Sequence, residues 1–359
     1  MAVFMYFILF AAGLLLVVKG SDWFVGSAVW AAQAFRISPL IIGATVVSIC
    51  TTLPETFVSS AAALKGETVM AAGNALGSIG VNTGFILAIL LFSTRPKIEN
   101  RREYLKHCFY LAFLLILLWF IGFFLGTIDR LAAIGLIVLF CLYIINNVLS
   151  ARKLMDLDIR YDLVDEEVVR DHLDPSTGMP EGIAYDESEN DFDVSLQYMA
   201  RKVLLFFFGV ALVILGSNLM VDNGIKIADV LGVPSFMIAV VFTSGGTSLP
   251  ELITTVASVR KGVSSLGIGN IIGANILNIL QVVGISALIH PISLAAEKSI
   301  LFFQLPILTL MVLSLAVPGL FCKGQTSRWN GIWLFILYLI FLTVNILRGA
   351  APILGPVLF

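Results

Sequence analysis

The chain has 359 residues, a net charge of −2, and a composition that is 58% hydrophobic but only 13% charged, with a mean hydropathy of +0.97. Soluble domains carry about 25% charged residues, so this composition excludes a soluble globular protein of such length. We expect an integral membrane protein whose surroundings are the lipid bilayer, with no nucleic-acid partner and no cofactor. The sequence does not indicate an oligomeric state.

Apolar segments of about 20 residues, the length that crosses a bilayer, follow one another along the chain. We predict ten membrane helices, near residues 2–20, 38–64, 69–92, 105–126, 130–150, 200–221, 234–259, 264–289, 297–320 and 329–348. The predicted fold class is an all-α, multi-pass integral membrane protein of the plasma (inner) membrane. It comprises a first five-helix repeat at 1–150, an acidic loop at 151–199, and a second five-helix repeat at 200–359.

The two halves of the chain are related by an internal duplication. The segments TTLPE at 51–55 and TSLPE at 247–251 lie 196 positions apart, and the same offset matches Gly20 to Gly216 and Asn82 to Asn278 without a gap. Because five helices precede the second half, it starts from the opposite side of the membrane, which predicts two inverted repeats.

The distribution of charge predicts the orientation. Most Lys and Arg residues of the membrane domains flank connections on one side, and the positive-inside rule then places the N-terminus outside and the 151–199 loop in the cytoplasm. That loop carries fourteen acids against four bases and has no EF-hand spacing, so we interpret it as a solvated linker.

Glu55 and Glu251 each lie in the middle of a predicted span, where a carboxylate is costly unless it meets a cation or polar partners. Pro54 and Pro250 precede them and remove a backbone donor, which predicts broken helices that expose carbonyl oxygens near the membrane midplane. Hydroxyl groups flank each acid, at Thr51, Thr52, Thr247 and Ser248, with Ser48 and Ser244 one turn earlier.

The next helix of each repeat contributes a second polar face. Asn74, Ser78 and Asn82 recur every four residues and therefore stack on one side of the first of these helices. In the second repeat the same positions hold Asn270, Ala274 and Asn278. Asn82 and Asn278 can share a depth with the acids, whereas Asn74 and Asn270 can equally serve as interhelical hydrogen bonds.

Carboxylates, amides, hydroxyls and carbonyls together form an all-oxygen site typical of a hard cation. Calcium fits such a site best, because it accepts six to eight flexible oxygen ligands. Two carboxylates neutralise one divalent ion, whereas the empty site at minus two meets a large desolvation barrier. After it releases calcium, the site should therefore turn back to the first side of the membrane only with sodium ions or protons bound. This predicts an exchanger and not an enzyme.

At these residues the sequence resembles the cation/calcium antiporter superfamily, in particular its Na⁺/Ca²⁺ exchangers. Members carry Gly-Thr-Ser-x-Pro-Glu followed by Gly-Asn-x-x-Gly-Ser-Asn-x-x-Asn/Asp, matched here at 43–82 and 239–278. The resemblance implies transport of Ca²⁺ and Na⁺, with Glu55 and Glu251 as the central ligands. It further implies ligands at Thr51, Thr52, Thr247, Ser248, Ser78, Asn82 and Asn278, and carbonyl ligands around Ser48 and Ser244.

The chain departs from this pattern at Cys50, Ile79 and Ala274, which replace a glycine, an asparagine and a serine. The missing hydroxyl at Ala274 weakens a flanking sodium site, so a proton-coupled exchanger of Ca²⁺ or another divalent cation stays open as the alternative. A channel, or a non-transporting sensor that uses the acidic loop, is a third reading. The acids retained in both repeats argue against it.

Overall fold

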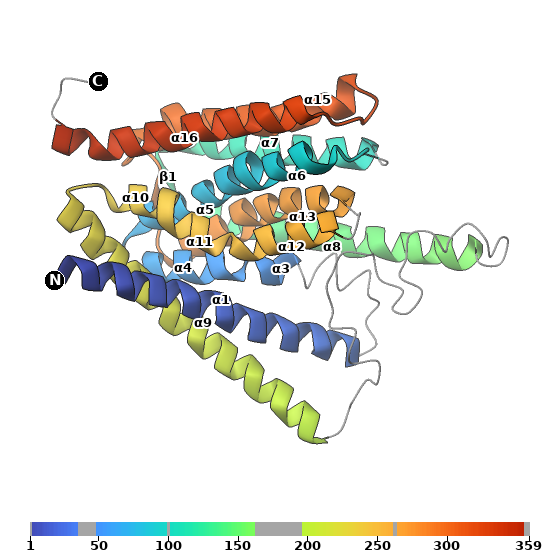
Figure 1. Ribbon diagram of the computed structural model, residues 1–359, viewed down its shortest axis with the longest axis horizontal. Helices are drawn as coiled ribbons and strands as arrows, with labels where there is room; N and C mark the ends of the chain where they lie inside the picture. Colours follow the sequence, from blue (N-terminus) through green and yellow to red (C-terminus); the bar gives the residue numbers. More distant parts are fainter. Residues whose placement is uncertain (1, 35–47, 99–100, 162–195, 261–263, 355–359) are drawn as a thin grey trace.

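The structure, a computed structural model, describes residues 2–34, 48–98, 101–161, 196–260 and 264–354. Nearly all of these residues are helical, and most helices run along the long axis of the molecule (Figure 1). Within the described ranges, nine helices are long and apolar enough to cross a membrane. The predicted span 38–64 begins outside the described residues, and its described part is helical from Ser48 onward. The prediction of an all-α, multi-pass membrane protein is confirmed.

The elements follow the repeat. The first half contains α1 (Ala2–Ala34), α3 (Ser48–Thr51), α4 (Leu53–Leu64), α5 (Thr68–Gly80), the π-helical η2 (Val81–Ile86), α6 (Leu87–Thr94), α7 (Arg101–Phe124), β1 (Thr127–Ile128) and α8 (Arg130–Tyr161). The second half contains α9 (Leu196–Leu231), α10 (Ser235–Ile238), η3 (Ala239–Thr243), α11 (Ser244–Thr247), α12 (Leu249–Arg260), α13 (Ser264–Leu277), η4 (Asn278–Val283), α14 (Gly284–Ile289), β2 (Ile292–Ser293), η5 (Ile300–Gln304), α15 (Leu305–Phe321) and α16 (Arg328–Leu354).

An odd number of membrane crossings per half requires the two ends of the chain to lie on one side and the junction between the halves on the other. In Figure 1 the start of α1 and the end of α16 lie at the left end of the molecule, whereas α8 ends and α9 begins toward the right. Both helices extend into the predicted loop, since α8 continues to Tyr161 and α9 begins at Leu196. Which end of the molecule faces the cytoplasm stays a prediction.

Helices α1 and α9 are longer than the predicted spans 2–20 and 200–221. The residues after each predicted span contain no proline, so no strong breaker stops the helix there. The first breaker after α9 is the Gly232-Val233-Pro234 segment, and Gly232 adopts a positive φ of 64°.

An antiparallel crossing of α1 and α9 forms the outer face of the molecule below α4 and α11 in Figure 1. Two glycine pairs bring the backbones together. A Cβ at Gly13 would lie 2.8 Å from the backbone oxygen of Gly216, and a Cβ at Gly20 would lie 2.7 Å from that of Gly209. The 196-residue offset maps each pair onto the other, so the crossing follows the internal duplication.

Two main-chain bridges between the halves were not predicted. Strand β1 pairs with β2 in antiparallel register, with Thr127 opposite Ser293, and an isolated bridge joins Lys97 to Gln325. Lys97 and Ser293 are equivalent positions of the two repeats, whereas their partners Gln325 and Thr127 lie 198 positions apart, two residues off the repeat offset. The bridges join connections that are far apart in sequence, which no local pattern reports.

The main hydrophobic core is formed by α5, α6, α7, α13, η4 and α15, and it buries residues from both halves. Helices α5 and α13, which follow the two broken helices, are the most buried spans of the described chain. Asn74 and Ser78 on α5 and Asn275 on α13 are therefore held inside the protein.

Candidate cation site

Two broken helices carry the acidic motifs. Helix α3 ends at Thr51 and α4 begins at Leu53, and the intervening Thr52 has φ −87° and ψ 1°. In the second repeat Ser248, with φ −82° and ψ 7°, separates α11 from α12. Each proline lies in the first turn of the second half-helix, where its missing N–H is tolerated while the carbonyl four residues back loses its donor. The predicted breaks are present in both repeats.

The breaks place one glutamate in the first turn of α4 and one in the first turn of α12. Glu55 and Glu251 are 0% and 1% exposed. The Ser248 hydroxyl lies 3.5 Å from Oε1 of Glu55, and the Thr247 hydroxyl is also close to this carboxylate. Thr51 contacts Glu251, and the two carboxylates lie near enough to interact electrostatically. Hydroxyl groups of each repeat thus lie next to the glutamate of the other repeat.

The two asparagines lie in π-helical segments. Asn82 is the second residue of η2 and Asn278 the first of η4, and both are fully buried. Segment η4 packs against α4, which carries Glu55, while η2 packs against α12, which carries Glu251. Wide turns of this kind are frequent at functional sites, because they re-aim side chains and loosen backbone hydrogen bonds. The sequence did not predict them.

Several buried oxygen atoms of this region make no hydrogen bond. They are Oε2 of Glu55, Oε2 of Glu251, Oγ of Ser78, Oδ1 of Asn82 and Oδ1 of Asn278. The Ser78 hydroxyl faces Glu55 but without ordinary hydrogen-bond geometry. Buried acceptors are normally satisfied, so a set composed only of oxygens fits a bound cation and suits a hard one such as Ca²⁺ or Na⁺.

The remaining predicted residues lie near the same breaks. Thr52 is fully buried at the first break. Ser244 begins α11, and its hydroxyl donates to the carbonyl oxygen of Val240 at 2.6 Å. Ser48 begins α3, but its side chain lies outside the described residues. Gly77 allows the approach of α5 to α11, since a Cβ there would lie 2.7 Å from Oγ of Ser244.

Asn74 and Asn270 make the interhelical hydrogen bonds that the sequence left open for them. Nδ2 of Asn74 donates to Oγ of Ser59 at 2.9 Å and to the carbonyl oxygen of Glu55 at 3.3 Å. Nδ2 of Asn270 donates to Oγ1 of Thr254 at 3.3 Å. Both asparagines therefore join α5 or α13 to the broken helix of its own repeat.

Sequence reasoning missed two polar links between the repeats. Nε2 of Gln281 donates to Oγ1 of Thr56 at 3.0 Å, and Thr56 in turn donates to the carbonyl oxygen of Thr52 at 2.9 Å. Asn275 bonds to Asn82 and to its neighbour Thr83. The usable signal was the presence of amides at Asn275 and Gln281 in an apolar helix, but their partners lie more than 190 residues away.

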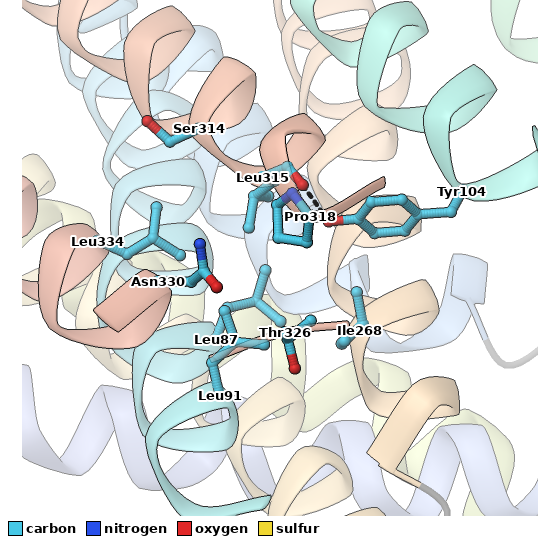
Figure 2. Close-up of a pocket in the computed structure, with 10 residues that line it drawn as sticks. All are labelled: Leu87, Leu91, Tyr104, Ile268, Ser314, Leu315, Pro318, Thr326, Asn330 and Leu334. Atoms are coloured by element: carbon cyan, nitrogen blue, oxygen red, sulfur yellow. Dashed lines mark hydrogen bonds between the residues drawn. The ribbon is translucent and has the colours of Figure 1, made fainter. Parts of the chain in front are cut away.

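Figure 2 shows a small cavity elsewhere in the bundle, between α6, α7, α13, α15 and α16. Its lining is mostly leucine, isoleucine and proline, with polar groups from Ser314, Thr326 and Asn330 and the ring of Tyr104. No carboxylate lines it, so it does not compete with the broken helices as a cation site. Across the described ranges, no group of three or more His, Cys, Asp and Glu residues could hold a metal ion.

A family model described as "sodium/calcium exchanger protein" matches residues 5–149 and 201–347. The chain belongs to this family. The two matched ranges fall one in each half, and together they contain both acidic motifs and both buried asparagines.

Relatives of this sodium/calcium exchanger family member cover most of its length. The sodium/calcium exchanger MaX1 of Methanosarcina acetivorans is 28% identical over 349 residues, which is 94% of this chain and 97% of that protein. The inner membrane protein YrbG of Escherichia coli is 34% identical over 290 residues, 79% of each chain. The solved sodium-calcium exchanger NCX_Mj superposes with a TM-score of 0.58 at 26% identity, covering 95% of this chain and 99% of that one.

Proposed function

We propose that the protein exchanges Ca²⁺ for Na⁺ across the membrane by alternating access, with the divalent ion held between Glu55 and Glu251. The observation that carries this proposal is the pair of fully buried carboxylates at two helix breaks, each with one oxygen that has no hydrogen-bond partner. Membership of the sodium/calcium exchanger family supports the choice of ions.

Charge neutralisation provides the mechanism. Two ionised carboxylates and one Ca²⁺ sum to zero, so the loaded site can be exposed to either side without an unpaired charge inside the bilayer. An unloaded site would carry two negative charges, and that barrier prevents return without counter-ions. Sodium ions neutralise the site equally well, which couples the two fluxes in opposite directions.

The oxygens around the carboxylates are proposed as the further ligands. Thr51, Thr52, Thr247 and Ser248 lie at the breaks, Ser78 faces Glu55, and Asn82 and Asn278 have unpartnered amide oxygens. We assign backbone carbonyls around Ser48 and Ser244 to the same set, because Pro54 and Pro250 remove the helical donors of the nearby carbonyls of Cys50 and Gly246. Calcium accepts such mixed oxygen ligands, whereas Mg²⁺ gives up its water reluctantly.

The decisive test measures calcium flux in proteoliposomes of the purified protein. An outward sodium gradient at constant pH, with protons equilibrated by an ionophore, should drive calcium uptake, and replacing internal sodium with choline should abolish it. A pH gradient without sodium should drive no uptake. Uptake driven by the pH gradient alone would contradict sodium coupling and establish proton coupling.

A specific observation keeps the proton-coupled alternative as the second candidate. Ala274 is 1% exposed and presents a methyl group at the position equivalent to Ser78, whose hydroxyl faces Glu55. One flanking site is therefore poorer in oxygen than the other. A carboxylate that lacks a neighbouring sodium ligand can instead return protonated, with the same glutamates as the central groups.

If sodium is the counter-ion, the Ala274→Ser variant should lower the sodium concentration that half-activates calcium exchange, and Ser78→Ala should raise it. One hydroxyl ligand contributes roughly 0.5–1.5 kcal/mol, up to about tenfold in apparent affinity. Sodium titrations at fixed pH measure this shift. Ala133→Ser, at a buried alanine of α8 outside the proposed site, is the control. Unchanged sodium activation in both site variants would favour proton coupling.

We also propose that residues 1–150 and 200–359 are inverted repeats joined by an acidic cytoplasmic linker at 151–199. The support is structural symmetry within the described residues. The glycine crossing of α1 and α9 pairs equivalent positions in opposite order, and the equivalent residues Lys97 and Ser293 each form a main-chain bridge to the other half. Inverted repeats give the site two equivalent routes of access, one from each side.

A further inference from the structure

A chain of side-chain amides crosses between the repeats beside the proposed site. Nδ2 of Asn82, on η2, donates to Oδ1 of Asn275, on α13, at 3.0 Å. Nδ2 of Asn275 donates in turn to Oγ1 of Thr83 at 2.8 Å. All three side chains are 0% exposed. The chain therefore lies in a medium of low dielectric, where each hydrogen bond is strong and an unpaired group is costly.

The orientation of an asparagine amide decides whether it can bind a cation. One end of the group is an oxygen acceptor and the other an NH₂ donor that repels positive charge. In Asn82 the NH₂ end is engaged by Asn275, while Oδ1 is buried and has no hydrogen-bond partner. Reversing Asn82 alone would place its oxygen against Oδ1 of Asn275, where neither atom can donate a hydrogen bond. Asn275 turns its oxygen toward Asn82 because its NH₂ end donates to Oγ1 of Thr83.

We propose that Asn275 is a positioning residue that holds the amide oxygen of Asn82 toward the transported cation. This inference rests on the proposed function of the site, in which Asn82 is a ligand. Asn275 itself has its oxygen engaged by Asn82, so it acts through Asn82 and not as a ligand. Ordering the ligand before the ion arrives reduces the entropy lost on binding and raises affinity.

The two repeats differ in this hydrogen-bonded support of the asparagine. The position equivalent to Asn275 in the first repeat is Ile79, which has no polar atom to orient Asn278. Asn278 nevertheless has an unpartnered, buried Oδ1 like that of Asn82. The structure thus gives only one of the two asparagines a cross-repeat amide support. The Asn82 side of the site is the pre-ordered one.

Calcium binding to purified protein tests the inference through a double-mutant cycle. The measurement is the calcium concentration that half-saturates binding, from radioactive calcium or from the calcium-dependent rise in melting temperature. Asn275→Leu should raise this half-saturating concentration about three- to tenfold, because the Asn82 oxygen is no longer held in one orientation. Asn82→Ala should raise it at least as much. The double variant should equal Asn82→Ala alone, since Asn275 acts only through Asn82.

The outcomes separate the inference from the function on which it rests. If Asn82→Ala weakens calcium binding while Asn275→Leu does not, the positioning role is overturned and the site stands. Additive effects in the double variant also overturn it, because a merely structural residue weakens binding in either background. If Asn82→Ala leaves binding unchanged, Asn82 is not a ligand and both proposals fail at this residue.

A second variant covers the case in which Asn275→Leu does not fold. Thr83→Val keeps the volume of the side chain and removes only the acceptor for Nδ2 of Asn275. It should raise the half-saturating calcium concentration about two- to threefold in the native background and not at all in Asn82→Ala. Equal melting temperatures of the cation-free variants show that the fold is intact. An unchanged calcium affinity in Thr83→Val would contradict the proposal that Thr83 orients Asn82 through Asn275.

Discussion

Calcium exchange is expected to be lost in Glu55→Gln and in Glu251→Gln. Each substitution keeps the size and polarity of the side chain but removes half of the negative charge that neutralises the divalent ion. Leaving a buried charge without its partner costs about 3–5 kcal/mol, which corresponds to a loss of roughly a hundredfold or more in calcium affinity. The two variants should be equally impaired, because both carboxylates are fully buried and each has one unpartnered oxygen.

Calcium uptake into proteoliposomes under an outward sodium gradient measures this loss. Glu67→Gln is the matched control, because Glu67 precedes α5 and accepts a hydrogen bond from Ser235 outside the proposed site. A glutamine can accept the same bond, so exchange should stay near normal. Size-exclusion chromatography shows whether each variant is folded. Near-normal exchange in a folded Glu55→Gln or Glu251→Gln protein would contradict the assignment of the central ligands.

The second large effect is expected at the crossing of α1 and α9. A Cβ at Gly20 would lie 2.7 Å from the backbone oxygen of Gly209 and 2.9 Å from the backbone nitrogen of Val213. Backbone atoms of a packed helix cannot rotate away, so Gly20→Val must separate the two helices. Overpacking of this kind costs about 1–3 kcal/mol. We expect a lower melting temperature in detergent and reduced exchange.

Gly26→Val is the matched control on the same helix. No atom lies within 4 Å of a Cβ built at Gly26, so the same added side chain meets open space there. Its melting temperature should stay close to that of the native protein. Equal melting temperatures of the Gly20→Val and Gly26→Val variants would show that the close approach of α1 and α9 does not support the fold.

Much of the proposed site could be predicted from local sequence. A proline before an acid in an apolar run indicates a broken helix even when the neighbouring helices are unknown. The N–H that proline lacks would have bonded to a carbonyl of the same helix. Both breaks are present, at Thr52 and Ser248. The four-residue spacing of Asn74, Ser78 and Asn82 placed them on one buried helical face, since helix geometry is local.

The outcome at Asn74 and Asn270 could not be predicted, because hydrogen-bond partners of amides depend on neighbouring helices. The repeat predicts equivalent bonds for them. Asn74 does bond to Ser59, but Asn270 bonds to Thr254 and leaves the hydroxyl of Thr255, the equivalent of Ser59, without a partner. The 196-residue offset relates positions in sequence, but it does not make their surroundings equal.

By itself the sequence determined the membrane class, the duplication, the two helix breaks and the acids within them, because hydropathy, spacing and proline chemistry act over a few residues. The tertiary structure decided which groups meet. The glycine crossing of α1 with α9 and the hydrogen bonds that link Asn82, Asn275 and Thr83 join residues at least 189 positions apart. Such contacts form only when the two halves pack together, so the physical reason for the site's geometry lies in the association of the repeats.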